Sequence, residues 1–381
     1  MTNNMLHIVA DETIWNIMLV CGMALSLVFT GILIPQILLI AFRKKLFDEP
    51  DGRKIHHSTV PRLGGIAFEH VILFSFFILL VLDINSGRYL LSNELQSHTL
   101  ELSVSVCSLI LLYLVGIADD LVGVKYRAKF VVQITCGILF LVGGLSVSDC
   151  HGIFGIHQLP SFLSIPFSII MVVFIINAIN LIDGIDGLAS GLSGVALLFY
   201  TYIFYQLGEY LYALISITTL GTIIPFFYYN VFGNPEKHRK IFMGDSGSLT
   251  IGLILCLLSF KIANLDMSLH PETSVYNPLV LAFIPLMIPC MDVVHVFIHR
   301  VRHHKNPFLP DKNHIHHKLL RMGMSQRSSL LLILVLSALF MVGFILLSQY
   351  VNINIVFIVY IIIYTGLNCW MSHKIKGIEG K

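Results

Sequence analysis

The stretch NAINLIDGIDGLASG, residues 177–191, joins two apolar segments of the chain, 165–176 and 192–204. Its two aspartates, Asp183 and Asp186, are three residues apart, so on a helix or a turn they share one face. A glycine follows each aspartate and allows a tight or left-handed backbone there. Because carboxylates at a membrane boundary are costly without a counter-charge, the pair predicts a cation or a cationic ligand. The alternative is a solvated loop, since loops favour Asn, Asp and Gly in any case.

Composition indicates a membrane protein. Of the 381 residues, 56% are hydrophobic and only 12% are charged, about half the charged fraction of an average soluble domain. Many apolar runs reach the ~20 residues that a helix needs to cross a bilayer. We therefore predict a single all-α polytopic domain with about 11 transmembrane helices. The predicted spans are 14–41, 64–82, 102–118, 130–147, 161–179, 189–206, 210–229, 247–261, 276–298, 329–348 and 353–371.

Other protein classes find little support in the sequence. The seven cysteines form no CxxC pair and most lie within apolar runs, so neither a disulfide framework nor a zinc ribbon is expected. The net charge of +2 gives no reason to expect a nucleic-acid partner. The N-terminus has no Lys or Arg before a run long enough to span, so we expect no cleavable signal peptide.

The distribution of Lys and Arg predicts the orientation. Of 24 such residues, all but Arg88 and Lys261 lie in four loops and the C-terminal tail. With eleven spans these loops and the acidic segment 180–188 fall on one side, which the positive-inside rule makes the cytoplasm. We therefore expect the N-terminus outside and the C-terminus inside. The four basic loops are 42–63, 119–129, 230–246 and 299–328.

The aspartates gather on the same side as the cations. None is placed in the middle of a predicted span, as a pump or a lipid or sugar transporter would tend to require. Acids among cations at one water-facing boundary suit an enzyme that acts on a charged, water-soluble substrate. These aspartates are Asp119, Asp120, Asp183, Asp186, Asp245 and Asp311, with Asp292 near them.

Two basic loops pair phosphate-binding residue types with acids. In residues 48–65, Arg53 and Arg62 could hold phosphate, or could simply determine topology. In GIADDLVGVKYRAK, residues 116–129, adjacent Asp119 and Asp120 end a span and Lys129 follows. Adjacent carboxylates repel, so one of them is expected to have a raised pKa or to contact a cation. That suits a base or a magnesium site near phosphates, although a charged helix end is the alternative.

The next loop predicts an anion site at a helix N-terminus. After Asn230 and Asn234, residues 244–249 read GDSGSL and run into a span. Small residues beside an aspartate at a helix start leave backbone N–H groups and the positive dipole end available to phosphate. Asp245 and Ser246 would also cap the helix, and capping is compatible with phosphate binding.

The longest loop is rich in histidine. His314, His316 and His317 lie within four residues, but no HExxH pattern and no nearby cysteine support a zinc site. With many Lys and Arg around them, donation to a pyrophosphate is favoured over metal binding. The pair His303 and His304 lacks such a context and is expected at the surface.

Together these motifs resemble one family, the bacterial polyprenyl-phosphate N-acetylhexosamine-1-phosphate transferases, which is related to the phospho-MurNAc-pentapeptide translocase. The likeness covers nearly the whole chain, and the HIHH sequence is similar to the branch that uses UDP-N-acetylglucosamine. Five ordered motifs carry it: DGRKIHHSTVPRLGG (51–65), DDLVGVKYRAKF (119–130), NAINLIDGIDGLASG (177–191), IFMGDSGSL (241–249) and PDKNHIHHKLL (310–320).

The resemblance implies a multi-pass protein of the bacterial inner membrane with its active site in the cytoplasm. The implied reaction transfers N-acetylglucosamine 1-phosphate from the UDP-sugar to undecaprenyl phosphate and releases UMP, starting a cell-envelope glycan. UDP-N-acetylgalactosamine and UDP-MurNAc-pentapeptide are the alternative donors, and a homodimer is possible. Mg²⁺, or Mn²⁺, is the implied cofactor.

The resemblance also implies roles for individual residues. Asp245 and Asn180 are the expected metal contacts. The catalytic group comprises the remaining acids and the histidines: Asp119, Asp120, Asp183, Asp186, His314, His316 and His317. The expected substrate-binding residues are Arg53, Lys129, Asn177, Asn180, Asn230, Gly244 and Ser246. A phosphate monoester is mostly ionised at neutral pH because its second pKa is ~6. A general base is therefore helpful rather than obligatory, and we expect Asp119 to take the residual proton or to orient the phosphate.

Overall fold

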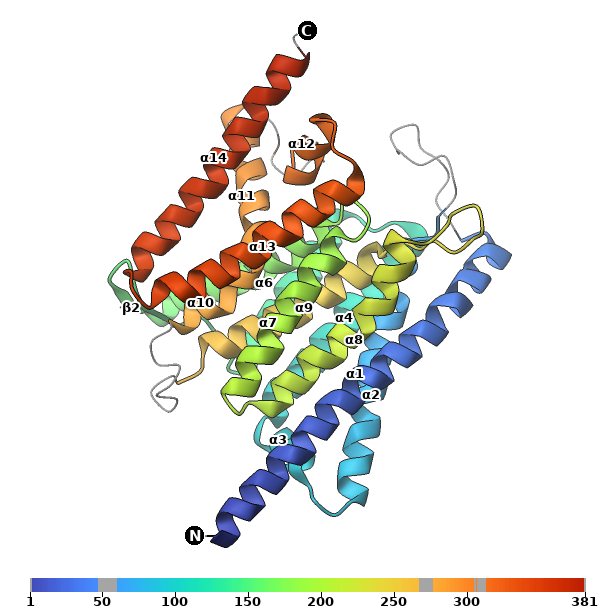
Figure 1. Ribbon diagram of the computed structural model, residues 1–381, viewed down its shortest axis with the longest axis vertical. Helices are drawn as coiled ribbons and strands as arrows, with labels where there is room; N and C mark the ends of the chain where they lie inside the picture. Colours follow the sequence, from blue (N-terminus) through green and yellow to red (C-terminus); the bar gives the residue numbers. More distant parts are fainter. Residues whose placement is uncertain (1, 47–59, 267–276, 305, 307–312, 380–381) are drawn as a thin grey trace.

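The structure, a computed structural model, is a bundle of long helices (Figure 1). It describes residues 2–46, 60–266, 277–304, 306 and 313–379, with only the backbone of residues 2–10 and 379. The helices are α1 (Thr2–Lys44), α2 (Ile66–Asn85), α3 (Leu90–Ser97), α4 (Thr99–Val122), α5 (Tyr126–Val142), α6 (Ser161–Ile182), α7 (Leu188–Gln206), α8 (Tyr210–Val231), α9 (Gly244–Ala263), α10 (Pro278–Phe283), η2 (Ile284–Leu286), α11 (Met287–Arg302), α12 (Ile315–Arg321), α13 (Gln326–Ser348) and α14 (Ile353–Glu379).

The predicted all-α membrane fold is confirmed. In the described part of the chain, ten helices are long and apolar enough to cross a membrane, with α10, η2 and α11 forming one of them. The eleventh predicted span corresponds to α5, which has 17 residues and packs against α4 and α6 within the bundle. At 1.5 Å per residue, α5 covers about 25 Å, near the lower limit for a spanning helix.

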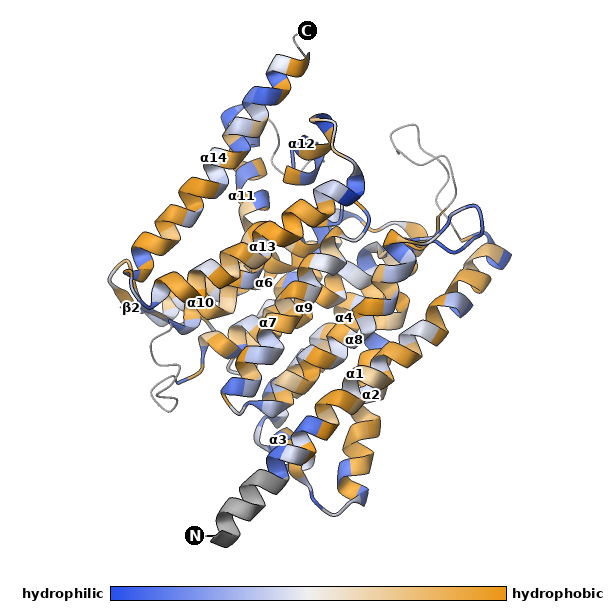
Figure 2. Cartoon of the chain, in the orientation of Figure 1, coloured by the Kyte–Doolittle hydropathy of each residue, from blue (hydrophilic) through white to orange (hydrophobic). Residues whose placement is uncertain are grey.

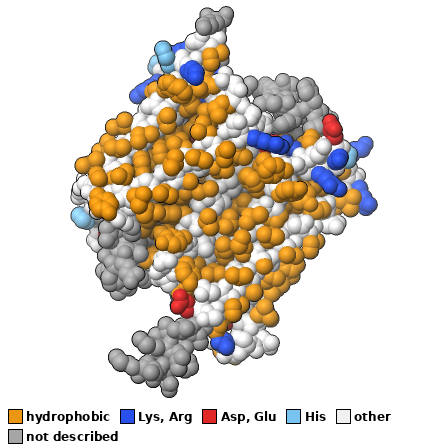
Figure 3. Space-filling view, viewed as in Figure 1, with side chains coloured by type: hydrophobic (Ala, Val, Ile, Leu, Met, Phe, Trp, Pro, Cys, Tyr) orange, Lys and Arg blue, Asp and Glu red, His pale blue; other side chains and the backbone are white. Residues whose placement is uncertain are grey.

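Apolar side chains cover the outside of the bundle as well as its core. Figure 2 shows hydrophobic residues along most of α13, of α14 and of α1 beyond residue 10, and Figure 3 shows them spread over one face of the molecule. The most hydrophilic residues in Figure 2 lie near the helix ends, and the Lys, Arg, Asp and Glu side chains visible in Figure 3 lie toward the ends of the bundle. Helices that are apolar both toward the core and on the outer surface of the bundle are typical of membrane spans.

Helix α9 occupies the centre of the bundle. Every residue from Ser246 to Ala263 is buried, and α4, α6 and α10 pack around the helix. Because α9 begins at Gly244, the GDSGS motif is held at one end of the most buried helix. We call this end of the bundle the site end.

Three glycines let the helices meet closely at the site end. A Cβ on Gly65, at the start of α2, would overlap the backbone of Gly247, and one on Gly116 would lie 2.5 Å from the Cα of Ser246. The backbone N–H of Gly65 donates to the carbonyl of Met243 at 2.8 Å. Any larger side chain here would push α9 away from α2 and α4.

Several predicted boundaries were wrong. The expected loop 119–129 is mostly helical, because α4 continues to Val122 and α5 begins at Tyr126. The polar segment before span 102–118 contains the short helix α3. A two-stranded antiparallel hairpin, β1 (Asp149–Ile153) with β2 (Ile156–Gln158), was not predicted at all. Short polar elements at span ends have too few residues to show a period, whereas long spans do.

Candidate active site

The acids of α4 and the start of α9 are joined directly. Asp120 accepts the backbone N–H of Asp245 at 2.7 Å with one carboxylate oxygen and that of Ser246 at 3.0 Å with the other. These N–H groups belong to the first turn of α9, where they have no partner within the helix. Asp120 therefore caps α9 from another helix and fixes where Asp245 lies.

Lys129 bridges two carboxylates in this cluster. Its ammonium lies 2.7 Å from Oδ2 of Asp245 and 3.3 Å from Oδ2 of Asp119. The other oxygen of Asp119 accepts the backbone N–H of Val124 at 2.7 Å. The spacing of Asp119, Asp245 and Lys129 thus creates a position between two carboxylates that holds a positive charge.

Asn180 reaches the same carboxylate from α6. Its Nδ2 donates to Oδ1 of Asp245 at 3.2 Å and to the hydroxyl of Ser248 at 2.8 Å. The α4, α5, α6 and α9 helices therefore all contribute a side chain to one centre around Asp245. We call Asp119, Asp120, Lys129, Asn180 and Asp245 the acidic centre.

Asp183 lies beside the acidic centre, immediately after α6 ends. Its side chain is accessible to solvent, yet surrounding protein displaces much of the water, and this raises its pKa to about 7. The negative charges of Asp186, Asp245 and Asp120 also raise this pKa, while Arg62 opposes them. The carboxylate of Asp183 makes no hydrogen bond within the described part of the chain, and it would gain most from a cation brought by a ligand.

The negative charge of Asp186 is already paired with a lysine. It forms an ion pair with Lys240 from the loop before α9. The next residue, Gly187, has φ +79° and donates its N–H to Asn230 at 2.6 Å, and Asn230 donates to the carbonyl of Ile241 at 2.8 Å. Asn230 thereby joins the loop after α6 to the loop before α9. Both the oxygen and the nitrogen of its amide are used in these hydrogen bonds, which indicates a positioning role.

The histidine loop is anchored by a buried aspartate. Asp292 on α11 is fully buried, and its Oδ2 lies 2.7 Å from Nδ1 of His314. Its Oδ1 accepts the backbone N–H of Ile315 at 2.8 Å and the hydroxyl of Tyr364 at 3.2 Å. Three donors on one buried carboxylate fix the start of α12 against α11 and α14. The sequence placed Asp292 near the site side but did not predict this role.

His316 connects the histidine loop to the stretch 177–191. A Cβ on Gly184 would overlap the Nε2 of His316, so the ring lies directly on this glycine. The ring is 1% exposed, and neither nitrogen has a hydrogen-bond partner among the described residues. Burial, together with His317 and His314 nearby, lowers the pKa of His316 to about 3, so its imidazole is neutral at physiological pH. His314 and His316 are stacked, with ring centroids 5.6 Å apart.

The remaining predicted site residues fall into different surroundings. Asn177 exchanges hydrogen bonds with Gln133 of α5 inside the bundle, at 2.6 and 3.4 Å, and among the described residues its side chain makes no hydrogen bond to the acidic centre. Gly244 has φ +74°, and a Cβ there would lie 2.5 Å from the Asp120 carboxylate. Ser246 is fully buried and contributes its N–H. Arg53 lies outside the described residues.

The acidic centre fits a hard divalent cation in its chemistry. Carboxylate and amide oxygens are the ligands that Mg²⁺ prefers, usually one or two carboxylates completed by water and substrate phosphate. Asp245, Asp119 and the amide of Asn180 offer such groups, and the ammonium of Lys129 already occupies a bridging position between two of them. No group of three or more His, Cys, Asp or Glu in the described ranges is arranged as a complete metal site. A cation here would therefore depend on oxygens from a substrate.

Comparison with known proteins gives the family. The profile described as glycosyl transferase family 4 matches residues 102–263, from the start of α4 to the end of α9. A protein of Bacillus subtilis named as a probable undecaprenyl-phosphate N-acetylglucosaminyl 1-phosphate transferase is 30% identical over 91% of this chain and 90% of its own. The chain belongs to glycosyl transferase family 4.

Two further relatives carry a closely similar name, undecaprenyl-phosphate alpha-N-acetylglucosaminyl 1-phosphate transferase. The protein of Yersinia pestis is 30% identical and that of Escherichia coli K12 is 28% identical, each over 79% of this chain and 76% of the relative. The resemblance predicted from the five motifs is confirmed. The matched segment 102–263 includes every member of the acidic centre, together with Asp183 and Asp186.

Proposed function

We propose that this protein transfers N-acetylglucosamine 1-phosphate from UDP-N-acetylglucosamine to undecaprenyl phosphate, releasing UMP at the cytoplasmic face of the bacterial inner membrane. The names of its relatives support undecaprenyl phosphate as the acceptor and N-acetylglucosamine 1-phosphate as the group transferred. The observation that carries the proposal is the acidic centre, in which Lys129 bridges Asp119 and Asp245 at the ends of membrane-spanning helices. Such a centre is within reach of both a lipid phosphate and a soluble nucleotide.

The reaction joins two anions, and the site supplies cations where they meet. An oxygen of the lipid phosphate attacks the β-phosphorus of the UDP-sugar, forming a new P–O–P link. The bond from this phosphorus to the bridging oxygen breaks, and UMP leaves with that oxygen. Lys129 lies where it can neutralise the incoming phosphate, and Asp119 beside it can accept the residual proton of a phosphate monoester.

Asp245 and Asn180 would hold Mg²⁺, which when bound would supply positive charge to offset the negative charge that develops on the leaving UMP. The chain's own residues do the positioning. Asp120 holds Asp245 through the start of α9, and Asp183 and Asp186 lie at the adjacent loop. We place the nucleotide at this loop and the diphosphate between the acidic centre and the histidine loop, where the neutral imidazole of His316 can donate a hydrogen bond.

The test is turnover by the purified protein in nanodiscs. Undecaprenyl phosphate is supplied with UDP-N-acetylglucosamine, UDP-N-acetylgalactosamine or UDP-MurNAc-pentapeptide, with Mg²⁺, Mn²⁺ or EDTA. We expect UMP release and a lipid-linked sugar with the first donor, lost in EDTA. Absence of UMP with every donor would refute the proposal. A phosphorylated enzyme formed from the UDP-sugar alone, and absent in Asp119→Asn, would replace the single displacement by a two-step route.

A further inference from the structure

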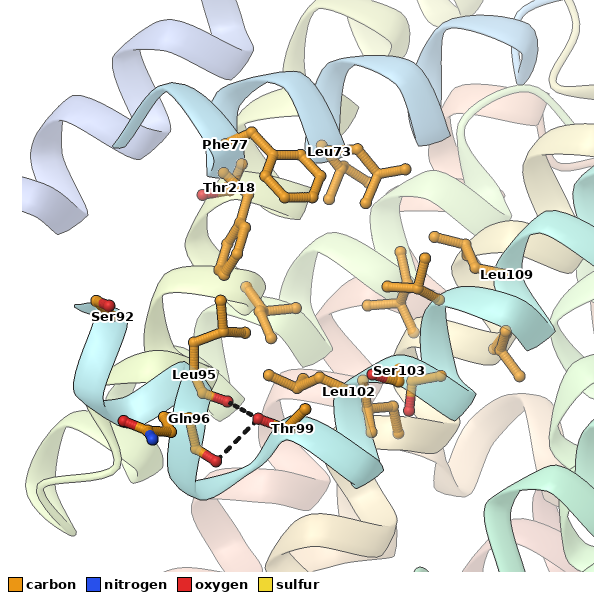
Figure 4. A pocket seen from close by; sticks show the side chains of 18 residues that line it. Leu73, Phe77, Ser92, Leu95, Gln96, Thr99, Leu102, Ser103, Leu109 and Thr218 are labelled. Atoms are coloured by element: carbon orange, nitrogen blue, oxygen red, sulfur yellow. Dashed lines mark hydrogen bonds between the residues drawn. The ribbon is translucent and has the colours of Figure 1, made fainter. Parts of the chain in front are cut away.

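A large apolar cavity lies away from the acidic centre. Its volume is about 730 Å³, and residues of α2, α3, α4, α8 and α9 line it. Figure 4 shows Leu73 and Phe77 of α2 facing Leu102 and Leu109 of α4 across the cavity, with Leu95 of α3 at one end. Pockets of this size accommodate ligands as large as a drug molecule.

The packing of α2 and α4 indicates that the cavity opens sideways, toward the lipid. Helix α2 packs mainly on α1 and α8, whereas α4 packs mainly on α5 and α9, so the two helices that face each other across the cavity are only loosely joined. Phe77 on the α2 rim is 52% exposed, and Ser103 on the α4 rim is also exposed. A molecule already dissolved in the bilayer could enter between them.

The cavity and the acidic centre share the helices α4 and α9. Helix α4 ends with Asp119 and Asp120, and α9 begins beside Asp245. From Asp120 back along α4, Leu109 lies about 16 Å away and Leu102 about 27 Å away, at 1.5 Å per residue. The cavity therefore occupies the half of the ~30 Å hydrocarbon core that is farther from the site end.

We propose that this cavity binds the distal part of the polyprenyl chain of the lipid substrate while its phosphate lies at the acidic centre. The proposal rests on the proposed function for the identity of that lipid. An extended undecaprenyl chain is longer than the ~30 Å core is thick, so its distal units must fold or bind somewhere. The cavity offers apolar walls at the required depth, on the same helices that hold the phosphate site, and an entrance from the bilayer.

Photolabelling tests the site without requiring turnover. A polyprenyl phosphate with a diazirine at its distal end is bound to the protein in nanodiscs and irradiated. We expect labelled peptides from residues 102–109 and 72–77, and loss of label with excess undecaprenyl phosphate but not with phosphatidylglycerol. Labels elsewhere only, or equal labelling of these peptides by a diazirine acyl phospholipid, would overturn the proposal in favour of an ordinary membrane lipid.

A cavity-filling variant tests its use in the reaction. Val106→Trp places a large side chain in the cavity, and the matched control Ile110→Trp places it on the same helix at a residue that is 42% exposed and does not line the cavity. We expect Val106→Trp to raise KM for undecaprenyl phosphate about tenfold by displacing bound hydrocarbon. KM for the UDP-sugar and kcat should not change.

Chain length separates binding in the cavity from general damage. The tail of geranyl phosphate is shorter than the ~16 Å from Asp120 to Leu109, so Val106→Trp should use it as well as the unmodified protein does. An equal loss with both lipids would refute the role of the cavity. If the unmodified protein turns over neither lipid, the proposed function has failed, and photolabelling still decides whether the cavity binds the chain.

Discussion

The two ends of α4 and α9 both carry clusters of charge, but their signs are arranged differently. At the end opposite the site, Glu101 lies in the first turn of α4 and Lys261 in the last turn of α9. Both signs agree with the helix dipoles, which favour acids at N-termini and bases at C-termini. At the site end Asp245, in the first turn of α9, also agrees with its helix dipole, but Asp119 and Asp120 lie in the last turn of α4, where the dipole of that helix opposes them.

In the cluster at the opposite end, the charged side chains pair with one another. The ammonium of Lys261 lies 3.7 Å from Glu101, 3.9 Å from Glu209 and 4.5 Å from the centre of the Tyr212 ring. The Tyr212 hydroxyl donates to Glu101 at 2.7 Å. Each charged group has a partner supplied by the chain, so this cluster holds three helix ends together and needs no ligand.

The site end is left with charge to be balanced. Asp120 uses the start of α9 and Asp119 shares one lysine with Asp245, while Asp183 has no hydrogen-bonding partner within the described residues. Acids placed against a dipole, with fewer partners than they could use, form a site that gains from an added cation. The cluster at the opposite end therefore has a structural role, whereas the cluster at the site end is suited to bind a cation. Substitutions at each end test this difference.

The largest effect is expected at Asp245. Asp245→Asn keeps the shape of the side chain but removes the negative charge that pairs with Lys129 and accepts a hydrogen bond from Asn180. We expect turnover to fall at least ~10²-fold, as when a single electrostatic contact in an active site is lost. UMP release measures turnover, and Tm shows that the protein remains folded. Normal activity in this variant would remove Asp245 from the proposed metal site.

Gly184 should have the next largest effect. Gly184→Ala places a methyl group where the His316 ring lies, which we expect to cost about 1–3 kcal/mol of stability and to separate the histidine loop from the stretch 177–191. Activity should fall together with Tm. The double variant Gly184→Ala/His316→Ala should recover Tm but not turnover. Recovery of both would show that His316 only fills space.

The sequence predicts the spans well because each span is a run of mostly apolar residues that continues over several helical turns. It also brings to attention polar residues that meet in the structure, since Asp119, Lys129 and Asp245 lie together at the site end. It could not reveal that Asp120 caps α9 rather than facing a substrate, because this depends on two helices meeting. The close approach of Gly65, Gly116 and Gly247, and the contact between Asp292 and His314, likewise join segments far apart along the chain.

At the opposite end, Lys261→Met should change stability without changing catalysis. Removing the ammonium leaves Glu101 and Glu209 without their shared cation in a largely buried place, and we expect a loss of about 1–2 kcal/mol. A thermal unfolding curve in detergent should show a lower Tm, while kcat stays within about threefold of normal, since the site lies ~27 Å away along α4. A large loss of kcat at unchanged Tm would show that the two ends are coupled.

The smallest effect concerns pH and Asp183. Its pKa is raised from 3.8 to about 7 in the folded protein, so folding favours the protonated form. The resulting stabilisation is complete below pH ~4 and is lost as pH rises toward 7. Without metal or nucleotide, Tm should therefore decline between pH 5 and 7.5 less steeply in Asp183→Asn than in the unmodified protein. The control Glu236→Gln, on an exposed loop, should keep the unmodified slope. If Asp183→Asn leaves the slope unchanged, the acids around Asp183 are already compensated and the contrast between the two ends loses its electrostatic basis.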